Sequence, residues 1–252
     1  MIIVKNEREL EGMRASARLA ARIRDEIAAR TAPGVTTVEL GEWAHGMILE
    51  AGAENAFLGY RGFPGKICVS VNDEVVHGVP GERRIEIGDL VSIDVGLKLN
   101  GFVGDTATTV MVGVTDPKRI ALVRTTERAL AEGIAMAVAG NRLSDISHAI
   151  QKAAEGAGLS VVRDFVGHGV GRQMHEDPQI PNFGRAGRGA RLKKGMTLAI
   201  EPMVTMGRHA VTVDEDGWTV RTKDGTAAAH FEHIVAVCNG KAEILTRSDE
   251  NG

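Results

Sequence analysis

An internal repeat is the feature that most limits how this chain can fold. The glycines Gly34 and Gly52, which flank one helical stretch, recur at identical spacing as Gly140 and Gly158 around another. After each helical region comes an apolar, β-compatible run, residues 88–94 and 195–201, with a glycine six residues before an acid. The repeat predicts an α+β fold of two halves related by a pseudo-twofold axis.

Helix signals occur at corresponding places in the two halves. Asn6 with Glu9, and Thr36 with Glu39, have the spacing of a capping box. In this motif the side chain of each residue accepts a hydrogen bond from the backbone N–H group of the other residue. Ser144 or Asp145 is the expected start of a later helix. The expected helices are therefore residues 6–30, 36–52, 117–139 and 144 or 145 to about 158.

Four carboxylates interrupt sequence that is otherwise typical of buried strands. Asp94 and Glu201 end the two apolar runs, and Asp105 and Glu232 directly precede further β-compatible runs. A lone Asp after a strand is usually a turn or cap residue. A buried carboxylate, however, must be paired, protonated or bound to a metal, and no lysine or arginine adjoins these acids in the sequence. Four acids in register favour a site for divalent cations.

Histidines supply nitrogen ligands or polar groups for such a site. His168 lies between glycines, and His77 and His175 also stand in segments suited to a ligand or a tight turn. One histidine with four carboxylates suits Mn(II), Fe(II) or Co(II) at least as well as Zn(II). His230 should share a side with Glu232 and lie beside the site or on the surface, whereas His233 should face away as a structural residue.

The acids, histidines and neighbouring segments resemble those of the methionine aminopeptidase family, whose fold is called pita-bread. The matching segments are residues 59–64, 72–80, 167–171 and 175–178. The resemblance extends over the whole chain and implies two α+β halves around a central antiparallel sheet. We therefore expect one catalytic domain, residues 1–252, with half-repeats at about 6–112 and 117–245.

The resemblance also implies a role for each metal-site residue. Asp105 and Glu232 would bridge two divalent metal ions, His168 and Glu201 would complete the first metal's protein ligands, and Asp94 would bind the second. Glu201 would also move a proton during hydrolysis.

A second group of residues is implied to contact the substrate. His77 and His175 would contact it without binding metal. The walls of a small apolar pocket for the first side chain would be Tyr60, Phe63, Cys68, Met174 and Trp218. Trp218 follows a polar stretch, residues 214–217, where an aromatic side chain has little local core to join. Many relatives carry an aromatic residue where this chain has Met174, so we expect slightly relaxed selectivity.

The implied function is two-metal removal of the initiator methionine when the second residue is small, by a dinuclear methionyl aminopeptidase of the short bacterial form (type I). That form lacks the zinc-finger extension and the inserted helical subdomain of other members. An alternative is an Xaa-Pro aminopeptidase or prolidase of the same fold, which carries a long N-terminal domain. A further alternative is a non-catalytic pita-bread binding protein, which would have lost metal ligands that this chain keeps.

Composition limits the partners and the compartment. The net charge of −3 gives no overall attraction to nucleic acid or to an anionic membrane. Two cysteines form no disulfide framework, and no apolar run reaches the roughly 18 residues of a membrane span. We expect a cytoplasmic monomer that acts on the N-termini of nascent polypeptides. The ribosome is a further expected partner, through a basic surface of Arg208, His209, Arg221 and Lys223.

Overall fold

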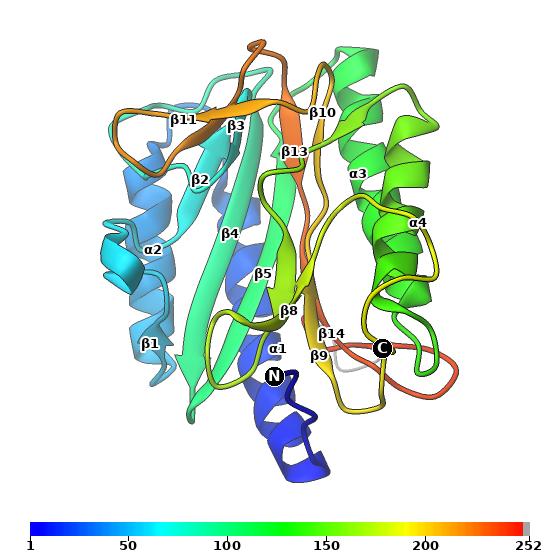
Figure 1. The fold of residues 1–252 in the computed structure, drawn as a ribbon. Helices are drawn as coiled ribbons and strands as arrows, with labels where there is room; N and C mark the ends of the chain where they lie inside the picture. The colour runs from blue at the N-terminus through cyan, green and yellow to red at the C-terminus, as the bar shows by residue number, and fades with distance from the viewer. Residues whose placement is uncertain (249–252) are drawn as a thin grey trace.

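Two helical pairs flank two main β-sheets in the computed structural model, which describes residues 1–248 (Figure 1). The last four residues of the domain expected over 1–252 lie outside the described residues. The helices are α1 (Glu7–Arg30), α2 (Thr37–Glu50), α3 (Pro117–Met136) and α4 (Leu143–Glu155). Figure 1 shows α2 on the left, α1 behind β4 (Leu90–Leu99) and β5 (Phe102–Met111) near the centre, and α3 and α4 on the right.

The first two helices begin where their capping boxes predict. The Asn6 side chain accepts the Glu9 N–H and the Glu9 side chain accepts the Asn6 N–H, and Thr36 does the same with Glu39. The expected start of the fourth helix was wrong by one or two residues. Arg142 is the N-cap residue, and the Asp145 carboxylate accepts the Arg142 N–H from inside the first turn.

The third helix also differs from its expected range, since it ends at Met136 instead of residue 139. Ala137 donates its N–H to the Ile134 carbonyl, which tightens the last turn. Val138 then leaves the helix and forms a parallel bridge with Cys238. A tertiary pairing therefore ends this helix, and no local sequence signal does so.

The strands form two principal antiparallel sheets. One contains β1 (Glu54–Asn55), β4 (Leu90–Leu99), β2 (Cys68–Val71) and β5 (Phe102–Met111). The other has the order β15 (Glu243–Ile244), β14 (His233–Ala236), β9 (Thr197–Ile200), β7 (Gly167–Gly169) and β8 (Glu176–Ile180). Two three-stranded sheets contain β13 (Ala228–His230), β10 (Met203–Thr205) and β6 (Ser160–Val161), and β11 (Val211–Val213), β12 (Val220–Thr222) and β3 (Glu74–Val76).

The two principal sheets meet at one backbone bridge. Glu232 donates its N–H to the Ala107 carbonyl at 3.0 Å, and Ala107 donates its N–H to the Glu232 carbonyl at 3.4 Å. The expected central sheet is thus assembled from two sheets that touch beside two of the acids, Asp105 and Glu232. This junction brings the two halves of the chain together at the candidate site.

The β4–β5 hairpin corrects the expectation that the first apolar run ends at Asp94. β4 continues to Leu99, so that Asp94 lies in the middle of a ten-residue strand. The turn that follows is Asn100-Gly101, with φ of 51° and 81°. An Asn-Gly pair suits the left-handed conformation that a two-residue hairpin turn requires. The dipeptide was a readable signal for the true end of the strand.

Each half has its own apolar core between its helices and its sheet. In the first half, Ile23 and Leu40 of the helices and Ile93 of β4 belong to one buried cluster. In the second, Ile146 of α4 and Leu198 of β9 belong to another. Because strand side chains alternate, the residues next to Ile93 point to the opposite face, away from the helices. Among the described helices, none combines the length and apolar character that a membrane crossing requires.

Candidate metal centre and substrate pocket

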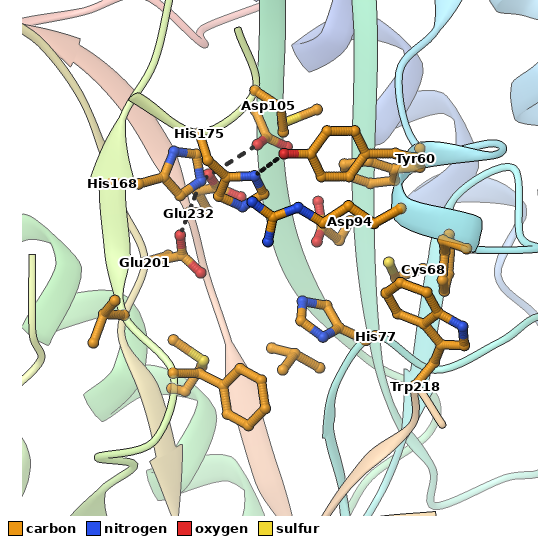
Figure 2. A pocket seen from close by; sticks show the side chains of 18 of the residues that line it. Tyr60, Cys68, His77, Asp94, Asp105, His168, His175, Glu201, Trp218 and Glu232 are labelled. Atoms are coloured by element: carbon orange, nitrogen blue, oxygen red, sulfur yellow. Dashed lines mark hydrogen bonds and ion pairs between the residues drawn. The ribbon is translucent and has the colours of Figure 1, made fainter. Parts of the chain in front are cut away.

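Four acids from four separate segments converge on the face of the sheets that the helices leave open (Figure 2). Asp94 lies on β4 and Asp105 on the paired strand β5, where Asp94 is opposite Ala107 and Asp105 is opposite Gly96. Glu201 directly follows β9, and Glu232 directly precedes β14. Each half therefore contributes two carboxylates, the first pair from within strands and the second pair from strand ends.

His168 joins this group from β7, between two closely packed glycines. A Cβ atom on Gly167 would lie 2.5 Å from the Ala199 carbonyl oxygen, and one on Gly169 would lie 2.1 Å from the Asp177 carbonyl oxygen. Only glycine lets β7 fit so tightly between β8 and β9. The His168 Nε2 atom lies 3.4 Å from Glu201 Oε1 and 3.8 Å from Asp105 Oδ2.

The imidazole of His168 is held in the form that binds metals. Its Nδ1 atom lies 2.9 Å from the Gly169 carbonyl oxygen and so carries the proton, which leaves the Nε2 lone pair directed at the acids. Burial lowers the pKa of His168 to about 3, with the nearby His175 as a smaller cause. The ring is neutral at physiological pH and can act as a ligand.

The four carboxyl groups have raised pKa values. Burial is the main cause in each case, and the neighbouring acids add to it for Asp94, Glu201 and Glu232. Burial raises the pKa of Asp105 to about 7. Acids this crowded ionise together only when positive charge lies among them. The site therefore favours binding of a cation.

Several oxygen atoms in the cluster lack any hydrogen-bond partner in the described protein. Asp94 Oδ1, Asp105 Oδ1 and Glu232 Oε1 are all buried and unpartnered. Asp105, His168 and Glu232 each offer one ligand atom, and these atoms lie within 4.8 Å of one another. Buried polar atoms without partners are costly, so the set of oxygen donors with one nitrogen fits a divalent cation.

The two other histidines reach the same cavity from different loops. His77 has φ of 59°, a conformation that is uncommon outside glycine, and its ring packs edge-on against Phe165 at 5.5 Å. Burial lowers the pKa of His77 to about 4. The ring of His175 lies 4.3 Å from that of His168, and its Nδ1 atom is 2.8 Å from the Tyr60 hydroxyl group.

A cavity of about 380 Å³ connects these groups. All twelve residues singled out in the sequence line it: Tyr60, Phe63, Cys68, His77, Asp94, Asp105, His168, Met174, His175, Glu201, Trp218 and Glu232. The Trp218 ring packs edge-on against Phe63 at 5.2 Å. Phe63, Cys68 and Met174 are each 5% exposed. The cavity has an acidic end and an apolar end, with His77 between Trp218 and the acids in Figure 2.

The structure places His230 beside the site, which is one of its two expected positions, and adds residues that the sequence reasoning missed. His230 is buried, not on the surface, and its Nε2 atom lies 3.8 Å from Glu201 Oε2. Phe57 and Phe165 also line the cavity. The apolar pair Phe165-Val166 shortly before His168 was an available signal for Phe165. His233 faces elsewhere, as expected, with Nδ1 2.8 Å from the Thr246 hydroxyl oxygen.

One buried arginine supports the site from behind. Arg24 of α1 donates to the Thr106 hydroxyl oxygen at 2.6 Å, and that hydroxyl group donates to the Glu232 carbonyl oxygen at 2.8 Å. The Arg24 charge also lowers the pKa of Glu232, against the larger effect of burial. No local pattern links residue 24 to residue 232, so the sequence held no signal for this contact.

A family model described as metallopeptidase family M24 matches residues 11–239, and the chain belongs to this family. Its full-length relatives narrow the class. The chain is 49% identical over 246 residues to a methionine aminopeptidase of Clostridium perfringens, covering 98% of this chain and 99% of that protein. It is 50% identical to methionine aminopeptidase 1 of Bacillus subtilis, covering 98% of this chain and 100% of that protein.

Solved structures agree with these relatives. A methionine aminopeptidase of Thermotoga maritima superposes with a TM-score of 0.96 at 46% identity, over 98% of this chain and all of that one. A prolidase of Pyrococcus furiosus has a TM-score of 0.80 at 22% identity, over 98% of this chain and 66% of that one, and so shows the fold alone. The expected pita-bread fold is confirmed, the chain is a metallo-aminopeptidase, and the Xaa-Pro alternative is not favoured.

Proposed function

We propose that this chain removes the N-terminal methionine of newly made proteins whose second residue is small. The observation that carries the proposal is a cluster of four carboxyl groups and one histidine at one end of a cavity whose other end is apolar. Relatives close to 50% identity over their full length are named methionine aminopeptidases, which supports the same reaction here.

We propose that two divalent ions bind in the cluster. Asp105 and Glu232 would bridge them, His168 and Glu201 would complete one site, and Asp94 would complete the other. The unpartnered buried oxygens of Asp94, Asp105 and Glu232 support this assignment. Such ions would supply a Lewis acid for the peptide carbonyl group and lower the pKa of a water molecule. The donors suit Mn(II), Fe(II), Co(II) or Zn(II).

The side chains around the ions transfer protons and donate hydrogen bonds during the reaction. Glu201 accepts a proton from the attacking water and passes it to the leaving amine, a task for which a carboxyl group of raised pKa is suited. When the Tyr60 hydroxyl group donates to Nδ1 of His175, the proton of that imidazole sits on Nε2. His175 then donates a hydrogen bond to the carbonyl oxygen as negative charge develops there.

His77 acts on the other side of the scissile bond. Its pKa of about 4 keeps the ring neutral at physiological pH, so that it has both a donor and an acceptor nitrogen. We propose that it hydrogen-bonds the amide nitrogen and assists its protonation as the bond breaks. The left-handed backbone at His77 aims the ring into the cavity, where Phe165 packs against it.

The apolar end of the cavity is the proposed pocket for the methionine side chain. Phe63 and Trp218 provide aromatic surfaces, and Cys68 and Met174 provide sulfur. A thioether packs well against both kinds of surface. A lysine side chain would leave an unpaired ammonium group among apolar walls. Burial and nearby acids hold the pKa of the Cys68 thiol well above its ordinary value, so it remains a neutral wall.

A peptide panel tests the proposed function. Met-Ala-Ser, Met-Gly-Ser and Met-Ser-Ser should be cleaved with added Mn(II) or Co(II), whereas Met-Lys-Ser, Met-Leu-Ser and Leu-Ala-Ser should be cleaved slowly. One misplaced methyl group in an apolar pocket is worth roughly 1–3 kcal/mol, or about 10- to 200-fold in rate. Equal cleavage of Leu-Ala-Ser and Met-Ala-Ser, or preferential cleavage of Ala-Pro peptides, would reject the assignment.

We further propose that the enzyme is a cytoplasmic monomer that meets its substrates at the ribosome. Both cysteines are unpaired, which suits a reducing compartment. Arg208 and Lys223 are exposed on the loops between Glu201 and Glu232 and are the proposed contacts. Arg221, included in the expected basic surface, is instead paired with Asp73, Glu74 and Asp214.

A further inference from the structure

A buried ion pair joins the N-terminal segment to the loop that carries His175. The Lys5 ammonium group lies 2.7 Å from Glu176 Oε2, and the two side chains are only 4% and 6% exposed. Of the lysine and arginine ion pairs within residues 1–248, it is the only one with both partners so deeply buried. A buried pair is expensive to form, and losing one partner leaves an uncompensated charge.

The Glu176 carboxylate organises the turn that precedes it. Its Oε1 atom accepts the backbone N–H groups of Arg172 at 3.0 Å and Gln173 at 3.3 Å, while Oε2 accepts the Lys5 ammonium group. The turn between these contacts carries Met174 and His175. One carboxylate thus closes the turn, and Lys5 places a cation against its second oxygen atom.

Lys5 is itself tied to the strand that leads to Glu201. The Lys5 N–H donates to the Gly195 carbonyl oxygen at 2.8 Å, and Val4 forms an antiparallel bridge with Met196, just before β9. Figure 1 shows the N-terminus beside β8 and β9. The ammonium–carboxylate contact therefore connects the His175 loop to the start of the strand that ends at Glu201.

The backbone leaves room for this pair. A Cβ atom on Gly171 would lie 2.5 Å from Glu176 Oε1 and 2.9 Å from Lys5 Nζ, so that no larger residue fits without displacing the contact. Gly171 also accepts the N–H of Val103, which follows the β4–β5 turn. The loop therefore packs against both halves of the protein, with the ion pair at its base.

We propose that Lys5 is a positioning residue that holds His175 in register with the metal cluster. His175 is solvent-exposed as a residue, and its ring contacts are those with Tyr60 and His168. Because Glu176 follows His175 directly and closes the turn before it, the Lys5–Glu176 contact sets the position of the His175 backbone. This inference rests on the proposed role of His175 in the reaction.

The test compares three variants of the full-length protein. Lys5→Met keeps most of the side-chain length and removes the charge, and Lys5→Arg keeps the charge. Lys66→Met is the matched control, because Lys66 pairs with Glu42 on the surface and does not line the cavity. For Met-Ala-Ser cleavage with Mn(II), kcat should fall at least about 10-fold in Lys5→Met, since small misplacements of a reacting group are costly.

The pattern of other measurements separates positioning from a merely structural role. KM and bound metal should change by less than about twofold in Lys5→Met, Lys5→Arg should keep most of kcat, and Lys66→Met should match the wild type. The nuclear Overhauser contact between the Tyr60 and His175 rings in the Zn(II)-loaded protein should weaken only in Lys5→Met. A lower melting temperature with unchanged kcat and an unchanged ring contact would overturn the proposal.

A neutral pair keeps the test decisive if Lys5→Met folds poorly. The double variant Lys5→Met/Glu176→Gln carries no buried charge, and its amide oxygen still accepts the loop N–H groups. We expect the stability of the double variant to return toward that of the wild type while its kcat stays low. Full recovery of both stability and kcat would refute positioning by Lys5. Wild-type protein that cleaves no Met-Ala-Ser would reject the proposed function instead, while the ring contact would still report the position of His175.

Discussion

The crowded carboxylates make one prediction that separates a metal site from an ordinary acidic cluster. The substitution Asp105→Asn should stabilise the metal-free protein at pH 8 and weaken its response to metal. In the wild type without metal, Asp105 is buried among other acids and its pKa is raised to about 7. The amide side chain of the variant has nearly the same shape and no charge, so the change removes repulsion without opening a cavity.

Two estimates give the size of the effect. Raising the pKa of a carboxyl group from 3.8 to about 7 costs about 4 kcal/mol of folding free energy at a pH above both values. Alternatively, two unit charges at the 4.8 Å that bounds the ligand atoms repel by about 3 kcal/mol at an effective dielectric constant of 20. Part of the folding cost is desolvation of the side chain, which the amide of the variant also experiences. We therefore expect Asp105→Asn to raise the free energy of unfolding by about 2–3 kcal/mol.

The effect has a defined pH dependence. Because the pKa of Asp105 is higher in the folded protein than in the unfolded chain, the folded state binds the extra proton between pH 3.8 and about 7. The contribution of Asp105 to the stability of the metal-free wild type therefore falls across this window as the pH rises. The advantage of Asp105→Asn should be absent below pH 3.8 and complete above pH 7. Comparing the two proteins cancels the contributions of the histidines.

Urea unfolding with a chelator, and then with Mn(II), measures both halves of the prediction. A ligand at 100 times its Kd stabilises by about 2.7 kcal/mol, and the variant should gain less than the wild type. Glu132→Gln, a carboxyl-to-amide change on the exposed face of α3, is the control and should stay within about 0.5 kcal/mol. An Asp105→Asn variant that is less stable than the wild type at pH 8 and still binds two metals would refute the reasoning.

Three further predictions follow from the cavity and its surroundings. His77→Ala and His175→Ala should keep the metal content of the wild type and lose roughly 100-fold or more in kcat, as measured by elemental analysis and peptide assays; parallel loss of metal would contradict their assignment. Met174→Phe should narrow the apolar pocket, so that the rate ratio of norleucine to methionine substrates falls; an unchanged ratio would remove Met174 from the specificity walls. Changing Arg208 and Lys223 to Glu should reduce co-sedimentation with ribosomes without altering peptide cleavage, and unchanged co-sedimentation would reject that surface.

Helix starts and strand ends could be predicted from the sequence where their signals lie within a few residues. The capping boxes at Asn6 and Thr36 mark where α1 and α2 begin, since each pairs residues three apart. The carboxylate Glu201 ends its strand as the pattern predicted. The Asn100-Gly101 turn was equally local, and its signal was available although the strand end was placed too early.

The metal-site residues could be predicted from the sequence for a different reason. Four acids in apolar segments and a histidine between glycines require compensation when buried, whatever the fold. All of them line one cavity. The apolar walls, such as Tyr60 and Cys68, followed only from family resemblance, because their residue types are as common in an ordinary core.

The amino-acid sequence by itself determined where the first two helices begin, the two β-compatible runs of each half and the chemical need for a cation among the acids. Only the tertiary structure decided how the halves meet, through Ala107 and Glu232, and which charges are neutralised. Arg221 pairs with Asp73, and Lys5 pairs with Glu176 across 171 positions of sequence. Such pairings depend on packing between segments that are distant along the chain, where neither helical nor strand periodicity carries information.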